Sequence, residues 1–282
     1  MQIISKADLL REKLGVWRAA GDRIALVPTM GNLHDGHLSL IRIAMQHANR
    51  VVVSIFVNPT QFAQGEDFEN YPRTLERDKL KLKKVSAHLL FVPEVETIYP
   101  FGLDRATTVS VPAFSHDLCG SFRPGHFDGV ASVVTRLFAL VQPDVAVFGQ
   151  KDYQQLLVIR RLAEDLNLAV QVIAGPTLRE KDGLAMSSRN QYLTADERKV
   201  APALHRVLSK TAVALQSGNR DYAALEIQGL KELQACGLTP DYLSIRHAEN
   251  LAVPGHDDGR LVVLVAAHLG AARLIDNVLV ET

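Results

Sequence analysis

The sequence predicts an α/β fold, in which a Rossmann-like doubly wound parallel sheet is followed by a smaller α+β domain carrying an antiparallel sheet. Up to about residue 177, short apolar runs rich in β-branched residues alternate with helical stretches. Beyond that point the order changes to helical stretches followed by three strand-like runs with short connections. The chain has 282 residues, of which 47% are hydrophobic, so it can bury the cores of two domains.

The first β-α-β unit begins with the run RIALVPTM at 23–30, whose continuous apolar character is typical of a strand buried on both faces. Leu38, Ile41 and Met45 recur at helical spacing and predict a helix over 36–48. The run RVVVSIFVN supplies the next strand at 50–58. The alternation then continues, with helices expected at 74–87, 128–141 and 153–167 and strands at 88–93, 145–149 and 169–177.

The domain boundary is expected where this alternation stops, which gives a Rossmann-like domain at 1–177 and a smaller C-terminal α+β domain at 178–282. Residues 194–236 have a helical pattern interrupted by polar breaks. The three strand-like runs that follow are DYLSIRHA, RLVVLVAAHL and ARLIDNVLV. Their short connections favour an antiparallel sheet.

Charge and cysteine content restrict the class of protein. Lys plus Arg equals Asp plus Glu at 31 each, so the formal net charge is zero, and nothing global favours a nucleic-acid or membrane partner. Cys119 and Cys236 are far apart and form no C-x-x-C pattern, which favours a reducing cytoplasm. The N-terminus carries charge every few residues, and the chain has no run of about 18 apolar residues. A soluble, cytoplasmic protein is expected.

The stretch PTMGNLHDGH at 28–37 places two histidines and two glycines between a predicted strand and a predicted helix. His34 and His37 are three residues apart, so both rings can face one anion at the helix N-terminus. Ligands of open α/β sheets bind at this end of the strands. A zinc pair is less favoured because no third ligand has recognisable spacing, and the G-x-G-x-x-G dinucleotide pattern is absent. A simple surface turn is the remaining alternative.

Two motifs resemble those of a known superfamily. HDGH resembles the H-x-G-H signature of nucleotidylyltransferases and class I aminoacyl-tRNA synthetases, and GLAMSSRNQYL at 183–193 resembles the KMSKS loop that closes over ATP phosphates. Further blocks make the chain similar to the pantothenate synthetase (pantoate–β-alanine ligase) family over residues 28–277. These blocks are PTMGNLHDGH, VVVSIFVNPTQF, YPRT, RPGHFDGV, FGQKDYQQ, DGLAMSSRN and ARLIDN.

The resemblance implies ATP-dependent ligation of (R)-pantoate to β-alanine in pantothenate and coenzyme A biosynthesis. Pantoate would attack the α-phosphorus of ATP to give a pantoyl-adenylate and pyrophosphate, and β-alanine would then displace AMP. Such chemistry needs positioning and charge stabilisation rather than a protein nucleophile. The implied partners are these small molecules, with Mg²⁺ held mainly by phosphates, and a second copy of the chain in a homodimer. No protein ligand of the metal is predicted.

The resemblance also assigns the ATP site. His34 and His37 would hydrogen-bond the phosphates, with His37 as the proton donor, and Lys151 would add positive charge. Asp152 would hold the ribose hydroxyls, unless it only caps the following helix. Ser187, Ser188 and Arg189 would form the phosphate loop, which lacks the lysines of the wider superfamily. The full expected ATP site is Met30, Gly31, Asn32, Leu33, His34, Asp35, Gly36, His37, Gly149, Gln150, Lys151, Asp152, Leu178, Met186, Ser187, Ser188 and Arg189.

Pantoate and β-alanine are expected to contact Gln61, Gln155, Met30, Asn58 and Arg123. Neutral glutamines at 61 and 155 would bind pantoate without pairing with its attacking carboxylate. Each residue also has a structural alternative: exposed polar residues at 61 and 155, a core methionine at 30, a turn former at 58 and an ion-pair partner at 123. A solvated surface lysine is the less favoured alternative for Lys151, because Lys151 follows Gly149 at the end of a predicted strand. His126 and His268 have no recognisable partners and are treated as ordinary polar residues.

Two other functions fit part of the pattern. A plain adenylyltransferase or cytidylyltransferase would keep HDGH but would have no use for Gln61 and Gln155. A nucleotide sensor on the same fold would tolerate loss of His34, His37 or Lys151, although all three are present.

Overall fold

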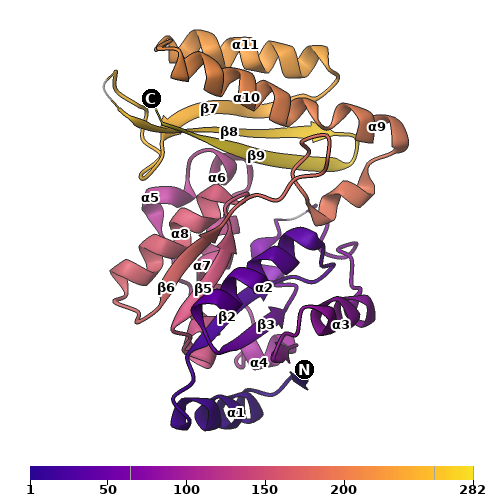
Figure 1. Ribbon diagram of the computed structural model, residues 1–282, viewed down its shortest axis with the longest axis vertical. Helices are drawn as coiled ribbons and strands as arrows, with labels where there is room; N and C mark the ends of the chain where they lie inside the picture. The colour runs from indigo at the N-terminus through magenta and orange to yellow at the C-terminus, as the bar shows by residue number, and fades with distance from the viewer. Residues whose placement is uncertain (64, 257, 282) are drawn as a thin grey trace. The chain divides into compact units, whose positions relative to one another are not determined.

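A computed structural model describes residues 1–63, 65–256 and 258–281. The chain separates into two compact units, which are described one at a time below. The first comprises Met1–Gln150 and Gln154–Pro176, and the second comprises Lys151–Tyr153 and Thr177–Thr282. One unit holds a six-stranded parallel sheet and the other a three-stranded antiparallel sheet, which confirms the predicted fold class (Figure 1).

The parallel sheet has the strand order β1-β4-β3-β2-β5-β6. Its strands are β1 (Gln2–Ile4), β2 (Ile24–Thr29), β3 (Arg50–Ile55), β4 (Leu89–Phe91), β5 (Val145–Gly149) and β6 (Gln171–Gly175). Five of the six coincide with predicted strands. The expectation that the HDGH turn follows the first strand is wrong, because the short β1 precedes β2 in the chain and pairs with β4 at the sheet edge.

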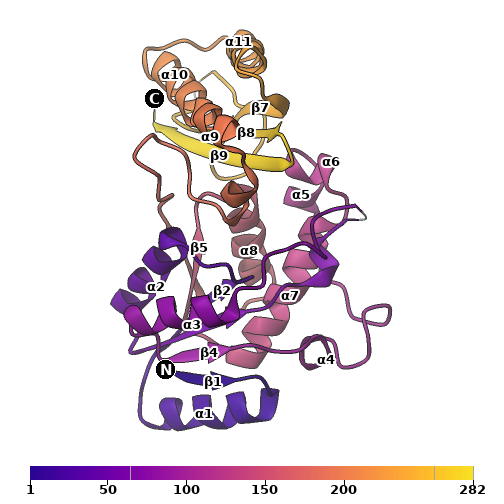
Figure 2. The ribbon, with the colours of Figure 1, turned by 90° about the vertical axis from the view of Figure 1, so that its right-hand side faces the viewer.

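Helices cover both faces of this sheet, with α2 and α3 on one face and α7 and α8 on the other (Figure 2). Valines such as Val27, Val53 and Val147 are fully buried under α2 and α3, as expected for strands with two covered faces. The helices of this unit are α1 (Ala7–Ala19), α2 (Asp35–His47), α3 (Leu75–Lys84), α4 (Val95–Ile98), α5 (Pro112–Ser115), α6 (Cys119–Phe122), α7 (His126–Val141) and α8 (Tyr153–Asp165), with a 3-10 turn η1 (Pro59–Gln61).

The strand order reverses between β2 and β5, which are neighbours in the centre of the sheet. The chain moves outward from β2 to β3 in one direction and from β5 to β6 in the other. Right-handed crossovers therefore place α2 and α8 on opposite faces, and the carboxyl ends of β2 and β5 lie where open α/β sheets have their ligand crevice. Those two ends carry the HDGH turn and the segment that starts at Gly149.

The helix α1 has no counterpart among the predicted elements. Leu10, Leu14 and Trp17 lie on its buried face at spacings of four and three residues. This spacing is the ordinary signal of an amphipathic helix. Frequent charges on the exposed face obscured it.

The second unit packs two long helices on one face of a three-stranded sheet (Figure 1). Its elements are η2 (Ser188–Tyr192), α9 (Ala195–Val200), α10 (Ala203–Gln216), α11 (Tyr222–Ala235), β7 (Thr239–His247), β8 (Arg260–Leu269) and β9 (Ala272–Glu281). Alternate residues of β8, including Val263 and Val265, are buried against α10 and α11. The predicted helical region and all three predicted strands are present.

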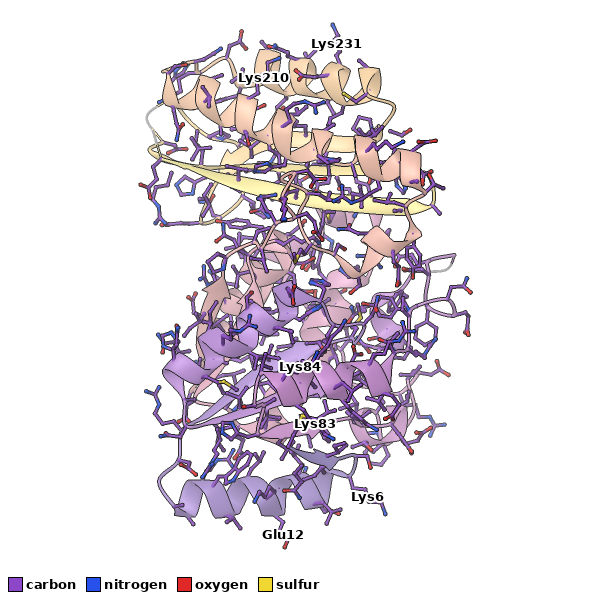
Figure 3. All side chains as sticks on the ribbon, turned by 45° about the vertical axis from the view of Figure 1, so that its right-hand side comes forward. Lys6, Glu12, Lys83, Lys84, Lys210 and Lys231 are labelled. Atoms are coloured by element: carbon purple, nitrogen blue, oxygen red, sulfur yellow. The ribbon has the colours of Figure 1, made fainter. Side chains whose placement is uncertain are left out.

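Charged side chains lie on the outer surfaces of the helices in both units. Lys83 and Lys84 are exposed at the end of α3, and Lys210 and Lys231 are exposed on α10 and α11 (Figure 3). Within the part of the chain that the structure covers, no helix is long and apolar enough to cross a membrane.

Candidate active site

The turn between β2 and α2 is built from Met30 to His34, and His34 is the N-cap residue of the helix. Gly31 and Asn32 both have positive φ angles, 83° and 47°. Two consecutive residues in this region fold the chain sharply, so the turn needs partners for its backbone N–H groups. The first of these partners is local, because Gly31 N–H donates to Thr29 Oγ1 at 3.2 Å.

Asp78 on α3 supplies the remaining partners of the turn. Its Oδ2 accepts from the N–H of Asn32 at 2.9 Å, and its Oδ1 accepts from the N–H of Leu33 at 2.8 Å. Thr74 Oγ1 also donates to Oδ2, at 3.1 Å, and Lys81 Nζ donates to the carbonyl of Leu33. Asp78 is buried, with 1% of its surface exposed, so this carboxylate fixes the turn from within the fold.

Sequence reasoning did not identify Asp78. The stretch LERDKLKLKK has the composition of a solvated helix face, and one aspartate within it carries no local signal. Only the neighbouring buried Leu82, four residues later on the same helix, marks the side of the helix that faces the sheet.

His34 and His37 lie together at the start of α2. Their ring centroids are 4.0 Å apart, with an angle of 40° between the ring planes. His37 Nδ1 accepts the backbone N–H of His34 at 3.3 Å, so Nδ1 carries no proton in this arrangement. The N–H of the His37 ring is therefore on Nε2, which can donate to an anion at the helix N-terminus.

The segment after β5 lies at the other side of the strand-order reversal. Gly149 pairs with Gly175 of β6, and Gln150 N–H donates to the Gly175 carbonyl at 2.8 Å. The Nζ of Lys151 lies 3.8 Å from Oδ1 of Asp152, and 16% of the Lys151 side chain is exposed. A side chain that is 16% exposed differs from the fully solvated lysine that was the structural alternative.

The backbone of Lys151 is anchored by Asn277 of β9, whose Nδ2 donates to the Lys151 carbonyl at 2.8 Å. Asn277 belongs to the block ARLIDN. The preceding Asp276 forms a bidentate ion pair with Arg179, at 2.6 and 3.0 Å. Two neighbouring residues of this block thus hold two segments that carry predicted ATP-site residues. Neither was among the predicted site residues.

The predicted phosphate loop follows a short pair of extended segments. Met186 N–H donates to the Leu178 carbonyl at 3.0 Å, and Arg179 pairs with Ala185. Ser187 then begins the 3-10 turn η2, because its Oγ accepts the N–H of Arg189 at 3.2 Å. The three side chains expected to bind phosphate, those of Ser187, Ser188 and Arg189, therefore all lie at the start of this turn.

The predicted pantoate residues Met30 and Gln61 are brought together. Gln61, at the end of η1, is buried with 8% of its surface exposed, and its Nε2 donates to Met30 Sδ at 3.1 Å. Asn58 is 1% exposed and donates from Nδ2 to Gln61 Oε1 at 3.2 Å. Its Oδ1 accepts the Thr60 N–H, so the turn-forming alternative describes Asn58 in this structure.

The second predicted glutamine, Gln155, lies half-buried on α8. Its neighbour Gln154 is buried and serves the fold. Oε1 of Gln154 accepts the Cys119 N–H at 3.1 Å, and Nε2 donates to the carbonyls of Phe114 and Asp117 at 2.7 and 2.8 Å. Gln154 therefore has a structural role, which the sequence does not distinguish from that of the adjacent Gln155.

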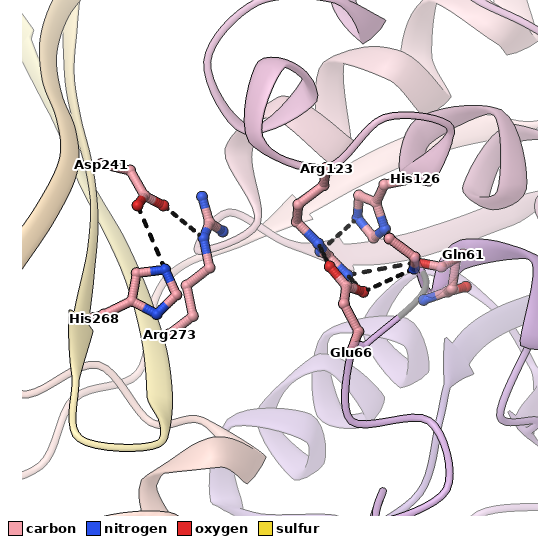
Figure 4. A network of polar contacts seen from close by, with 8 residues as sticks. Gln61, Glu66, Arg123, His126, Asp241, His268 and Arg273 are labelled. Atoms are coloured by element: carbon pink, nitrogen blue, oxygen red, sulfur yellow. Dashed lines mark hydrogen bonds and ion pairs between the residues drawn. The ribbon is translucent and has the colours of Figure 1, made fainter.

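Arg123 forms a bidentate ion pair with Glu66, with both distances at 2.6 Å, so the ion-pair alternative holds in this structure (Figure 4). Burial raises the pKa of Glu66, but the hydrogen bond and the charge of Arg123 and the Ala63 N–H outweigh it and lower the pKa overall. His126 joins the network, because its Nε2 accepts from Arg123 at 3.0 Å and its Nδ1 donates to the Gln61 carbonyl at 2.8 Å.

A second polar cluster lies within the other unit. Asp241 of β7 pairs with Arg273 at 2.8 Å and with His268 Nε2 at 3.4 Å (Figure 4). His126 thus contacts Arg123 three residues before it and Gln61 far along the chain, and His268 contacts Asp241 on another strand, so both histidines have partners that residue spacing did not indicate. Across residues 1–63, 65–256 and 258–281, no three or more His, Cys, Asp or Glu side chains are grouped so that they could hold a metal ion.

Comparison with known proteins gives one consistent result. The family model described as pantoate-beta-alanine ligase matches residues 2–279. A pantothenate synthetase of Ectopseudomonas mendocina is 57% identical over 281 residues, covering 100% of this chain and 99% of that protein. The crystal structure of pantothenate synthetase from Thermus thermophilus is 45% identical, with a TM-score of 0.92 and 99% of each chain covered. The pantoate-beta-alanine ligase from Francisella tularensis, complexed with beta-gamma ATP and beta-alanine, is 31% identical, with a TM-score of 0.83, covering 99% of this chain and 97% of that one.

Proposed function

The chain belongs to the pantoate-beta-alanine ligase family and is an enzyme of that type, and from this premise we propose which residues act on each substrate. The enzyme joins pantoate to β-alanine in an ATP-dependent reaction. A carboxylate does not acylate an amine in water without activation, so the ligation requires ATP to convert pantoate into a better acyl donor.

The proposed reaction has two balanced steps. A carboxylate oxygen of pantoate forms a bond to the α-phosphorus of ATP, and the bond to the β-phosphate oxygen breaks, which releases pyrophosphate. The deprotonated amine of β-alanine then bonds to the acyl carbon of the pantoyl-adenylate, AMP leaves with the electron pair of the acyl–oxygen bond, and the nitrogen releases one proton to water. Both steps depend on alignment and on stabilisation of phosphate charge.

The observation that carries this proposal is the arrangement of His34 and His37. The Nδ1 of His37 is occupied by the His34 N–H, which leaves Nε2–H as the donor of that ring. We assign this donor to the charge that develops on the α-phosphate and the leaving pyrophosphate. His34, whose ring is stacked near it at 4.0 Å, contacts the same phosphates in this proposal.

The other ATP contacts are proposed from the family resemblance. Backbone groups from Met30 to Gly36 and at Gly149 and Gln150 line the crevice between β2 and β5. Lys151 adds positive charge, Asp152 binds the ribose hydroxyls, and Leu178 packs on the adenine. Met186 provides backbone contacts, and Ser187, Ser188 and Arg189 donate to the β- and γ-phosphates.

Pantoate is assigned to Gln61, Gln155 and the apolar side chain of Met30. The contact between Gln61 Nε2 and Met30 Sδ supports a shared pocket for these two residues. Asn58 and Arg123 are engaged with Gln61 and Glu66, so their contribution to pantoate and β-alanine binding is proposed to be through these neighbours.

We also propose Mg²⁺, a homodimer and a cytoplasmic location, as the family resemblance implies. The donor groups of the described residues offer no protein cage for a metal ion, so Mg²⁺ is proposed to bind through the phosphates of ATP and water. When bound, it supplies charge neutralisation on the phosphates. None of the steps above is assigned to a protein-held metal.

The test mixes the protein with ATP, Mg²⁺ and pantoate and measures pyrophosphate, then adds β-alanine and measures AMP. A ligase releases pyrophosphate with pantoate and releases AMP only when β-alanine is present. A simple nucleotidylyltransferase ignores β-alanine, and a nucleotide sensor releases neither product. Either of those results, or full activity in a variant with both His34→Ala and His37→Ala, would exclude the proposed assignment.

A further inference from the structure

Asn58 lies at the centre of a buried set of hydrogen bonds in the first unit. Its Oδ1 accepts from Thr60 N at 3.4 Å, Thr60 Oγ1 at 3.1 Å and Tyr99 OH at 2.8 Å. Its Nδ2 donates to the Gly129 carbonyl at 3.1 Å and to Gln61 Oε1 at 3.2 Å. Both hydrogens of the amide and both lone pairs of its oxygen are therefore used within the protein.

Backbone partners determine which way the Asn58 amide faces. The Thr60 N–H can only donate, so it must face the amide oxygen, and the Gly129 carbonyl can only accept, so it must face the amide nitrogen. These two backbone partners therefore assign the oxygen and the nitrogen of the Asn58 amide. The second N–H of Asn58 then has to point at Gln61, which fixes Oε1 of Gln61 as the acceptor.

Gly129 makes this arrangement possible because it allows α7 to approach η1 closely. A Cβ atom added at position 129 would lie 2.3 Å from the Thr60 carbonyl oxygen and 2.7 Å from Gln61 N. No side chain fits there without moving the 3-10 turn that carries Gln61.

Tyr99 and Thr60 strengthen the same orientation. Their two hydroxyl oxygens are 3.1 Å apart and share two protons, so at least one proton must go to Asn58 Oδ1 in any arrangement that satisfies both. Tyr99 is 2% exposed, and burial raises the pKa of its phenol, so its proton is retained. The Arg136 guanidinium lies over the Tyr99 ring, 4.6 Å from its centroid, and restricts the ring further.

These contacts determine the direction in which the side-chain amide of Gln61 points. Its Oε1 is bound by Asn58, and its Nε2 faces the thioether of Met30, a weak acceptor that substrate oxygens can replace. Its backbone carbonyl is held by His126. Gln61 therefore presents N–H donors, whereas the opposite orientation would present a carbonyl oxygen to the oxygens of pantoate.

We propose that Asn58 and Tyr99 are positioning residues that hold the Gln61 amide with its N–H donors toward pantoate. This inference rests on the proposed function, in which Gln61 binds pantoate. It also extends that function, because the fixed polarity selects substrates that offer hydroxyl or carboxylate oxygens at this point.

The test measures KM for pantoate and for ATP in Asn58→Asp, Tyr99→Phe, Gln61→Met and the double variant of Asn58→Asp with Gln61→Met. An aspartate cannot donate to Gln61 Oε1, so it turns the Gln61 amide around. Asn58→Asp is expected to raise the pantoate KM about tenfold or more, and Tyr99→Phe severalfold, with the ATP KM changed less than about twofold. The control is Tyr222→Phe, which loses a hydroxyl bond to the Gly255 carbonyl in the other unit.

The double variant separates positioning from general damage. Once Gln61→Met has removed the amide, Asn58→Asp should not raise the pantoate KM further. If the new charge acts only by repelling the pantoate carboxylate, Asn58→Asp will raise the pantoate KM in the Gln61→Met background as well. That result would overturn the proposal. Equal effects on pantoate and ATP would overturn it too. If Asn58→Asp does not fold, the same comparison of pantoate KM values is made between Tyr99→Phe alone and Tyr99→Phe combined with Gln61→Met. An unchanged pantoate KM in Gln61→Met would instead refute the assignment of Gln61 to pantoate.

Discussion

His37 Nδ1 accepts the backbone N–H of His34 at 3.3 Å, and the two rings lie 4.0 Å apart. One nitrogen of His37 thus completes the start of α2, and the other carries the N–H that we assign to the phosphates. The same side chain caps the helix and contributes to the proposed chemistry. Substitutions that keep one of these two bonds can separate the two roles.

His37→Gln and His37→Asn form a matched pair for this purpose. A glutamine amide places an N–H near the position of ring Nε2, whereas an asparagine oxygen lies near the position of Nδ1. We expect both variants to lose about a hundredfold or more in kcat for pyrophosphate release, with His37→Gln retaining more activity than His37→Asn. His47→Gln, at the exposed far end of α2, is the control. Greater activity in His37→Asn would show that the cap matters more than the donor.

Asp78→Asn tests the buried carboxylate that holds the turn. The Asn32 and Leu33 N–H groups bind different oxygens of Asp78, and an asparagine replaces one of these oxygens by an NH2 group, which cannot accept an N–H. We expect the free energy of unfolding, measured in denaturant, to fall by about 1–3 kcal/mol, because a buried N–H donor loses its acceptor. We also expect the ATP KM to rise. The control is Asp8→Asn, whose side chain is 96% exposed. An unchanged ATP KM would show that the turn keeps its shape without this bond.

Glu66→Gln tests the ion pair with Arg123 through its pH dependence. The pKa of Glu66 is lowered in the fold from the ordinary value of 4.5, so the folded state favours the charged form. Its contribution to stability is present above 4.5 and is lost as the pH falls through the lowered pKa. The difference in unfolding free energy between wild type and Glu66→Gln should therefore be larger at neutral pH and shrink in acid. A difference that is constant with pH would contradict this.

Gly183→Ala tests the segment that leads to Ser187. Gly183 has a φ of +93°, and a Cβ there would lie 2.8 Å from His205 Nδ1. We expect a loss of about 1–3 kcal/mol in unfolding free energy, with lower ligase activity. Combining it with His205→Ala should recover part of the loss, since the contact is relieved and the backbone strain remains. Gly15→Ala in α1, where nothing lies within 4 Å, should instead stabilise the fold.

The sequence was sufficient for the fold because its signals are local. Continuous apolar runs such as 50–58 and the helical spacing of Leu38 and Ile41 identify elements without reference to distant residues. The two elements at the N-terminus, β1 and α1, were not predicted, for different reasons. The strand β1 has only three residues, and the charges of α1 concealed a regular buried face.

The candidate site was predictable to the extent that motifs recur in consecutive residues. HDGH and the serine–arginine turn were found in this way. Asp78 and Asn277 were missed because their partners lie 45 and 126 residues away in the sequence, and the Gln61 carbonyl to which His126 donates lies 65 residues away. A hydrogen bond over such a separation leaves no periodicity, so only the structure reveals it.

The attachment of Asn32 and Leu33 to Asp78 has a consequence for solvent exchange. Their amide protons are bound to a side chain of α3 rather than to a neighbouring strand or helical turn. Deuterium uptake at these two amides therefore reports how often α3 separates from the sheet, and occupancy of the crevice should slow it.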